Sequence, residues 1–154
     1  MIHKLVDNAA ILADVQARTK DAALKELLTT AQDAGVIGKK LATALSKKLL
    51  ERESIGSTGL GNGVAVPHLK HDDIERPSLV LARARTPIEW QSIDGRPVSI
   101  MFLVISSAAD PEAHLQCLRW ISTLARNADF RRFLLDADDG DSMRELLREL
   151  TPKS

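Results

Sequence analysis

Apolar residues recur every three or four positions in two segments near the N-terminus, which is the spacing of one face of a helix. The first predicted helix spans residues 19–34 and ends before Gly35, and the second spans about 38–50, before the charged segment 51–53. Their apolar stripes are Leu24, Leu27, Leu28 and Ala31 in the first, and Leu41, Leu45 and Leu49 in the second. A short apolar run at 9–15 precedes both helices and predicts a strand.

The middle of the chain has the pattern of strands. Short apolar segments at 64–68, 78–84 and 97–105 predict three of them, and Asp94-Gly95 is a turn signal before the last. Segment 54–63, which precedes these strands, holds four of the eight glycines of the chain. We therefore expect a tight loop there.

The C-terminal third returns to helical spacing. Asp110 is suited to cap a helix and Pro111 to occupy its first position, so a long helix is predicted to begin there. Apolar residues then predict a short helix around 130–134 and a last one after Gly140. Helices, then strands, then helices predict one α/β domain over residues 1–154, with a mixed sheet covered by helices.

Composition and charge exclude several classes of partner. The 21 Lys and Arg residues balance 21 Asp and Glu residues, and 44% of the chain is hydrophobic, as in globular domains. Nucleic-acid binding is not expected, because it needs a basic excess or exposed aromatic side chains, and the chain has no Tyr, three Phe and two Trp. The single cysteine, Cys117, cannot form an internal disulfide, which favours the cytoplasm. No signal peptide or membrane insertion is expected either.

The glycine-rich segment is the first candidate for chemistry, because backbone N–H groups of such loops can approach phosphate oxygens. It lacks the Gly-Lys-Ser/Thr end of a P-loop. Its glycines Gly59, Gly61 and Gly63 lie between a helix and a strand, which inverts the context of a dinucleotide-binding fingerprint. A turn with positive φ at two or three positions explains the same residues. The sequence alone leaves both interpretations open.

Two histidines are candidates for a reactive site. His68 follows Pro67, whose ring fixes φ and keeps Val66 extended, so the direction of the backbone at His68 is well defined. We expect His68 at the end of a strand beside the glycine loop, although a surface histidine without a role has the same pattern. His114 falls beside the apolar stripe in the first turn of the predicted helix, where the helix dipole disfavours its protonated form. A core-edge histidine bonded to a backbone carbonyl is the alternative.

Arg52 is the third candidate. It lies between two glutamates at the end of the second predicted helix, next to the glycine loop, and a guanidinium fork matches phosphoryl oxygens. The alternative is a helix-terminal cation favoured by the dipole, with Glu51 and Glu53 as solvated neighbours.

Other chemistries find less support. His68, His71 and His114 could be zinc ligands, but the chain has no HExxH motif and no paired cysteines, so no metal is expected. Cys117 lies among apolar residues of a helix, where a thiolate is disfavoured. A serine hydrolase would need a GxSxG elbow, which is absent from the sequence.

Taken with their neighbours, these residues resemble the phosphorylation-site signature of enzyme IIA domains of the fructose–mannitol type, from the bacterial phosphoenolpyruvate-dependent phosphotransferase system (PTS). The resemblance is carried by Arg52-Glu53, by segment 58–68, which ends in Pro-His, and by His114-Leu115. It continues through segments 87–90 and 94–98 and covers about residues 5–150.

The resemblance implies a role for each candidate. His68 would be the phosphorylated histidine, His114 the second active-site histidine that orients or stabilises the phosphoryl group, and Arg52 a residue that borders the site. The phosphoryl loop would comprise Thr58, Gly59, Gly61, Asn62, Gly63 and Pro67. The implied fold is a mixed β-sheet with helices on both faces, and the implied mechanism needs no cofactor and no metal.

The resemblance also implies partners. The phosphoryl donor would be a histidine phosphocarrier protein and the acceptor an enzyme IIB domain that serves sugar uptake. A nitrogen-related regulatory branch of the family instead binds partner proteins according to its phosphorylation state, and no residue separates the two branches. Leu69, Lys70 and His71 follow the Pro-His pair where many members have a small residue, so the rim that faces the partner is expected to differ.

Overall fold

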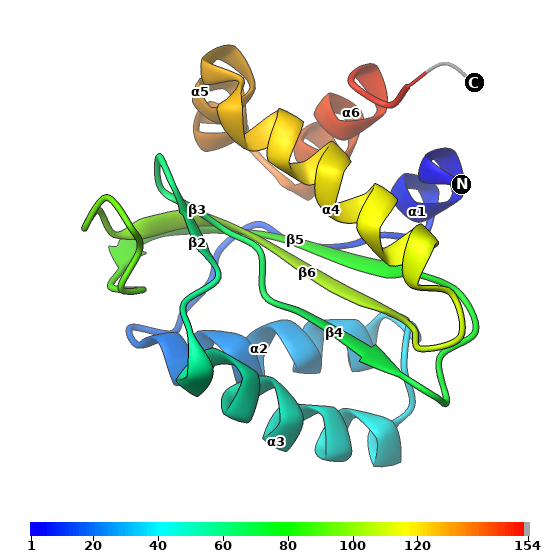
Figure 1. Ribbon diagram of the computed structural model, residues 1–154. Coiled ribbons are helices and arrows are strands. Elements are labelled where there is room, and N and C mark those ends of the chain that lie inside the picture. The colour runs from blue at the N-terminus through cyan, green and yellow to red at the C-terminus, as the bar shows by residue number, and fades with distance from the viewer. Residues whose placement is uncertain (153–154) are drawn as a thin grey trace.

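A mixed sheet separates two helical layers in the computed structural model, which describes residues 1–152 (Figure 1). The helices are α1 (Ile2–Asp7), α2 (Lys20–Asp33), α3 (Lys39–Ile55), α4 (Pro111–Arg126), α5 (Ala128–Asp136) and α6 (Gly140–Glu149). The strands are β1 (Ala10–Leu12), β2 (Gly59–Gly61), β3 (Val64–Ala65), β4 (His68–His71), β5 (Ser78–Ile88) and β6 (Val98–Ser107). Within residues 1–152, no helix has the length and apolarity required to cross a membrane.

The sheet has the order β1-β5-β6-β3-β2, and β4 also pairs with β6. Strands β1 and β5 are parallel, as are β3 and β4 with β6, whereas β5 and β6 run antiparallel. Helices α2 and α3 cover one face, and α1, α4, α5 and α6 lie over the other (Figure 1). The predicted fold class, a mixed sheet between helices, is confirmed.

Two apolar cores explain why the central strands are nearly continuous in hydrophobic residues. Side chains alternate between the faces of a strand, and both faces of β5 and β6 are covered by helices. On β6, Met101 and Leu103 pack toward α2 and α3, while Phe102 and Val104 pack toward α4 and its neighbours. Every residue from Ile100 to Ile105 is therefore buried.

Two boundaries differ from the prediction in ways that matter for the site. Helix α3 continues to Ile55, so Arg52 and Glu53 lie inside its last turns rather than after it. The predicted strand 64–68 is divided, and His68 begins β4 instead of ending a strand. The reason is Pro67, which has no N–H for the ladder, so β3 and β4 are consecutive segments along the same edge of β6.

The glycine-rich segment is half a hairpin, not only a loop. Residues Gly59–Gly61 form β2, which pairs antiparallel with β3. The turn has positive φ at Gly61 (90°), Asn62 (57°) and Gly63 (78°), as the structural interpretation of these glycines requires. A Cβ atom at Gly59 would collide with Ser92. Gly61 and Gly63 thus have a conformational reason to be glycine, and Gly59 has a steric one.

Candidate active site

His68 is placed by the backbone on both sides of it. The Pro67 carbonyl accepts a hydrogen bond from the Val104 N–H (3.0 Å), and the Val66 N–H donates to the Thr58 carbonyl (3.0 Å). The imidazole Nδ1 of His68 lies 2.7 Å from the Val66 carbonyl oxygen. Because a carbonyl oxygen can only accept, Nδ1 must carry the proton in this bond. The neutral ring therefore has its free lone pair on Nε2.

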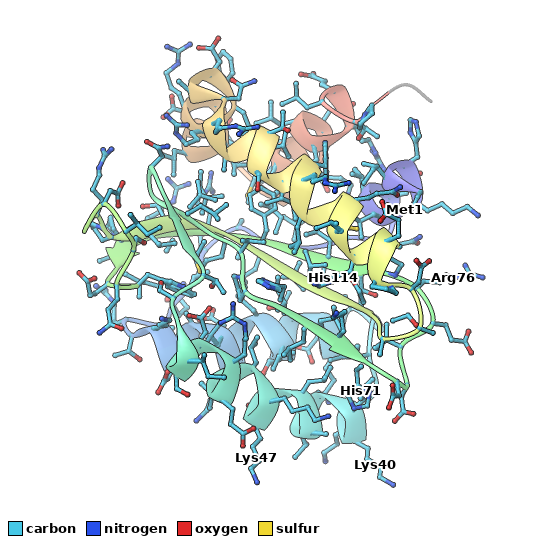
Figure 2. All side chains as sticks on the ribbon, in the orientation of Figure 1. Met1, Lys40, Lys47, His71, Arg76 and His114 are labelled. Carbon is cyan, nitrogen blue, oxygen red and sulfur yellow. The ribbon has the colours of Figure 1, made fainter. Side chains whose placement is uncertain are left out.

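His114 lies close to His68 but belongs to helix α4 rather than to the sheet. It lies in the first turn of α4, where the Asp110 side chain caps the helix by accepting from the Ala113 N–H (3.1 Å). Nδ1 of His114 lies 2.8 Å from the hydroxyl of Ser106 on β6. The ring centroids of His68 and His114 are 5.4 Å apart and their planes are inclined by 49°. Figure 2 shows His114 between α4 and the sheet.

Burial keeps His114 neutral. Its residue surface is only 7% exposed, and this desolvation lowers the pKa of His114 from 6.5 to about 4, with smaller contributions from the charges of His68 and Lys70. The neutral form expected from the sequence therefore has burial as its main cause. A neutral imidazole can donate one hydrogen bond and accept another, which suits it to hold an anionic group beside His68.

Arg52 and the tip of the hairpin make contacts of their own, and none of these contacts involves His68 or His114. The Arg52 guanidinium donates from Nη1 to the Gly56 carbonyl (3.0 Å) at the end of its own helix. The tip of the hairpin turns toward α5, away from β4 (Figure 1). The tip lies beyond Val64. Val64 pairs with Ile100 of β6 and His68 with Val104, so four residues of β6, or about 13 Å at the rise of a strand, separate the two positions.

Of the predicted phosphoryl loop, only the base of the hairpin reaches the neighbourhood of His68. Thr58 and Pro67 fix the backbone around it, as described above. The tip is used otherwise, because the Asn62 N–H donates to the Asp94 carboxylate (2.9 Å). Nearer the base, the Gly59 N–H donates to the Ser57 hydroxyl (3.0 Å). The structure does not bring Gly61, Asn62 and Gly63 together with the histidine pair.

Glu53 is not the solvated neighbour of Arg52 that the alternative interpretation of Arg52 requires. It is buried, and its carboxylate lies 2.7 Å from Nζ of Lys20. The Thr58 hydroxyl donates to the same carboxylate and accepts from the indole N–H of Trp90 (3.3 Å). The extension of α3 explains this burial, because the last turn carries Glu53 inward beneath the hairpin. This cluster links α2 and α3 to the backbone that places His68.

No metal-binding cluster of three or more His, Cys, Asp or Glu residues occurs within residues 1–152. His71 is three residues from His68 on the same strand and faces the opposite side of the sheet. Its Nδ1 accepts from the Asp73 N–H at 3.0 Å. Cys117 is buried, and burial raises the pKa of its thiol from 9.0 to about 11, so a thiolate is disfavoured.

Comparison with known proteins decides the family. Residues 4–150 match the model of "Phosphoenolpyruvate-dependent sugar phosphotransferase system, EIIA 2". The chain belongs to this type 2 EIIA family. Its predicted membership is confirmed over nearly the whole sequence.

Relatives of this EIIA chain carry two kinds of name. It is 34% identical over 132 residues to the PTS system fructose-specific EIIA component of Haloferax volcanii, covering 86% of this chain and 84% of that protein. It is also 34% identical over 146 residues to a nitrogen regulatory protein of Bradyrhizobium diazoefficiens, covering 95% and 94%. The chain spans only 23% of the fructose-specific EIIABC component of Bacillus subtilis, to which it is 27% identical over 148 residues.

A solved structure agrees with the fold of this EIIA chain. The nitrogen regulatory protein IIA-Ntr from Neisseria meningitidis superimposes with a TM-score of 0.79 at 25% identity, over 94% of this chain and 99% of that one.

Two residues that contact or face the histidines of this EIIA chain escaped the sequence analysis as site residues. Ser106 holds His114, and its position could be found only from the register of β6. Lys70 follows His68 by two residues in β4, and the sequence placed it only in the rim that faces the partner. Alternation along a strand is the signal that could have placed it on the same face as His68.

The lowered pKa of His114 leads to a prediction about acid stability. Between about pH 6.5 and pH 4 the unfolded chain binds a proton at His114 that the folded protein does not. The free energy of unfolding should therefore fall as the pH drops through this window. We expect His114→Gln to lose less stability than wild type between pH 7 and pH 4.5, measured by urea unfolding. An equal loss in both proteins would contradict the assigned pKa.

Proposed function

We propose that this EIIA chain accepts a phosphoryl group on Nε2 of His68 from a histidine phosphocarrier protein and passes it to an enzyme IIB domain. The observation that carries the proposal is the bond from His68 Nδ1 to the Val66 carbonyl, beside the neutral ring of His114. It leaves Nε2 as the nucleophilic atom and fixes the ring, and phosphoryl transfer depends chiefly on such positioning and on charge stabilisation.

The transfer balances without a general base. The lone pair of His68 Nε2 forms the new P–N bond as the P–N bond of the donor breaks, and the donor nitrogen keeps that electron pair. Nδ1 retains its proton, so the phosphorylated ring carries a positive charge that the Val66 carbonyl stabilises. In the second transfer a nucleophilic atom of IIB forms a new bond to phosphorus with its own lone pair. The P–Nε2 bond breaks and returns its electrons to His68, which becomes neutral again.

His114 has the geometry of a positioning partner in this scheme. If Nδ1 accepts the hydroxyl proton of Ser106, the ring proton lies on Nε2 and can be donated to a phosphoryl oxygen. Arg52 is proposed to border the site from the end of α3, as the family resemblance implies. The base of the hairpin, through Thr58 and Pro67, contributes by fixing the backbone at His68.

Phosphoryl transfer can be tested directly. Incubation of the chain with phosphoenolpyruvate, enzyme I and the carrier protein should yield one phosphoryl group per chain, with the acid lability of phosphohistidine. A known EIIA protein serves as the positive control for the donor mixture. If that control is labelled and this chain is not, the proposal is wrong.

A regulatory role is the second candidate, because a relative that the chain covers almost end to end is named a nitrogen regulatory protein. Phosphorylation would then act as a switch, adding up to about two negative charges at a site on a chain whose formal charge is zero. Labelling would occur in both cases. Restoration of sugar uptake by a cognate IIB–IIC pair would support transport and would count against a purely regulatory protein.

A further inference from the structure

Lys70 shares the face of β4 that carries His68. The two residues are separated by one position, so their side chains project to the same side of the strand. In the parallel register of β4 and β6, Lys70 is paired with Ser106, the residue that holds His114. Lys70, Ser106 and the two histidines therefore belong to one side of the sheet, beneath the first turn of α4.

The ammonium of Lys70 is available to an anion at this site. Its side chain is exposed, and it takes part in none of the ion pairs formed within residues 1–152. The register places it opposite Ser106, whose hydroxyl lies 2.8 Å from Nδ1 of His114, and its positive charge is one of the smaller causes of the lowered pKa of His114. The guanidinium of Arg52, by contrast, is tied to the end of its own helix through one N–H, which donates to the Gly56 carbonyl.

A phosphoryl group on His68 needs such a cation. The group would bring up to about two negative charges, of which the protonated ring of His68 offsets one, into a site whose second histidine is neutral. Charge-assisted hydrogen bonds to the phosphoryl oxygens are stronger than neutral ones. The flexible stem of a lysine allows its ammonium to follow the group as it arrives and leaves.

We propose that Lys70 is a phosphoryl-binding residue whose ammonium donates to the oxygens of the group on His68. The inference rests on the proposed function and adds to it the cation that neutralises the transferred group. It also assigns a role to a residue of the segment 69–71 that follows the Pro-His pair.

The test compares Lys70→Met and Lys70→Arg with wild type and with Lys47→Met. Lys47 is a matched control, because it is also exposed and outside the ion pairs of residues 1–152, but it projects from α3 on the other side of the sheet (Figure 2). The rate of phosphorylation is measured at several concentrations of phosphorylated carrier protein. The phosphorus resonance of the product is then recorded by NMR after the carrier is removed.

We expect Lys70→Met to lower kcat about tenfold and to shift the phosphorus resonance, because the ammonium contacts the bound group itself. Lys70→Arg should restore most of the rate, and Lys47→Met should match wild type. A raised KM with unchanged kcat and an unchanged resonance would show that Lys70 only docks the carrier, and would overturn the inference. So would a Lys70→Met protein that behaves as wild type. If wild type itself is not labelled, the proposed function is wrong, and this outcome is distinct from a failure of the Lys70 inference alone.

Discussion

Replacement of His68 by alanine is expected to abolish phosphoryl labelling by the carrier protein. The variant removes the only ring in the site whose Nδ1 is held by a backbone carbonyl and whose Nε2 is thereby left free to attack. His114 is not expected to substitute for it, since it is buried and its Nδ1 is engaged by Ser106. The measurement is the amount of label per chain at saturating carrier, compared with wild type prepared in parallel.

His71→Ala is the matched control for this experiment. His71 lies on the same strand, carries the same imidazole and faces the other side of the sheet, where its Nδ1 accepts from the Asp73 N–H. It should be labelled as fully as wild type. Unfolding midpoints of both variants show whether a loss of label reflects lost chemistry or a lost fold. Full labelling of a folded His68→Ala protein would assign the phosphoryl group to another residue.

Elements with local signals in the sequence were the ones that could be predicted well. Helix α2 begins after Thr19, whose side chain accepts from the Ala22 N–H, and α4 begins after Asp110, so both starts follow from capping residues. Helix α1 was missed, because six residues form a helix only when Leu5 and Val6 are buried against the other elements. The extension of α3 likewise depends on burial rather than on local pattern.

The candidate site was likewise predictable only in part. The positions of His68 and His114 relative to proline and to a helix start pointed to chemistry, and the family resemblance joined them. Their hydrogen bonds could not be predicted, because the partner of His114 is set by the register of β6 and the ring of His68 by the break at Pro67. The glycines illustrate the opposite case: a motif that suggests phosphate binding also has a conformational reason, since Gly61 and Gly63 adopt positive φ.

The buried cluster around Glu53 shows how the fold supports the site. Nζ of Lys20 lies 2.7 Å from the Glu53 carboxylate and 3.2 Å from the Trp90 carbonyl, so α2, α3 and the segment after β5 meet at one ion pair. The carboxylate also accepts from the N–H and the hydroxyl of Thr58. The Thr58 carbonyl accepts from the Val66 N–H, and the Val66 carbonyl accepts from Nδ1 of His68. The cluster is therefore connected to His68 through the backbone of Val66.

Replacement of Glu53 by alanine should therefore be strongly destabilising. The side chain of Glu53 is 3% exposed and that of Lys20 is 15% exposed, so removing the carboxylate leaves an ammonium and the Thr58 donors without their partner. Breaking a buried ion pair from one side costs about 3–5 kcal/mol. We expect a loss of that order in the free energy of unfolding, measured by urea denaturation.

Glu51→Ala is the matched control, because Glu51 is a glutamate two residues earlier in α3 and is exposed. It should change the free energy of unfolding by less than about 0.5 kcal/mol. The double variant Lys20→Met/Glu53→Met should be more stable than the sum of the two single variants predicts, because it leaves no unpaired charge behind. Additive losses would mean that the two charges do not stabilise each other. Phosphorylation at His68 should also slow in folded Glu53→Ala protein, since the backbone that fixes the ring has then lost its anchor.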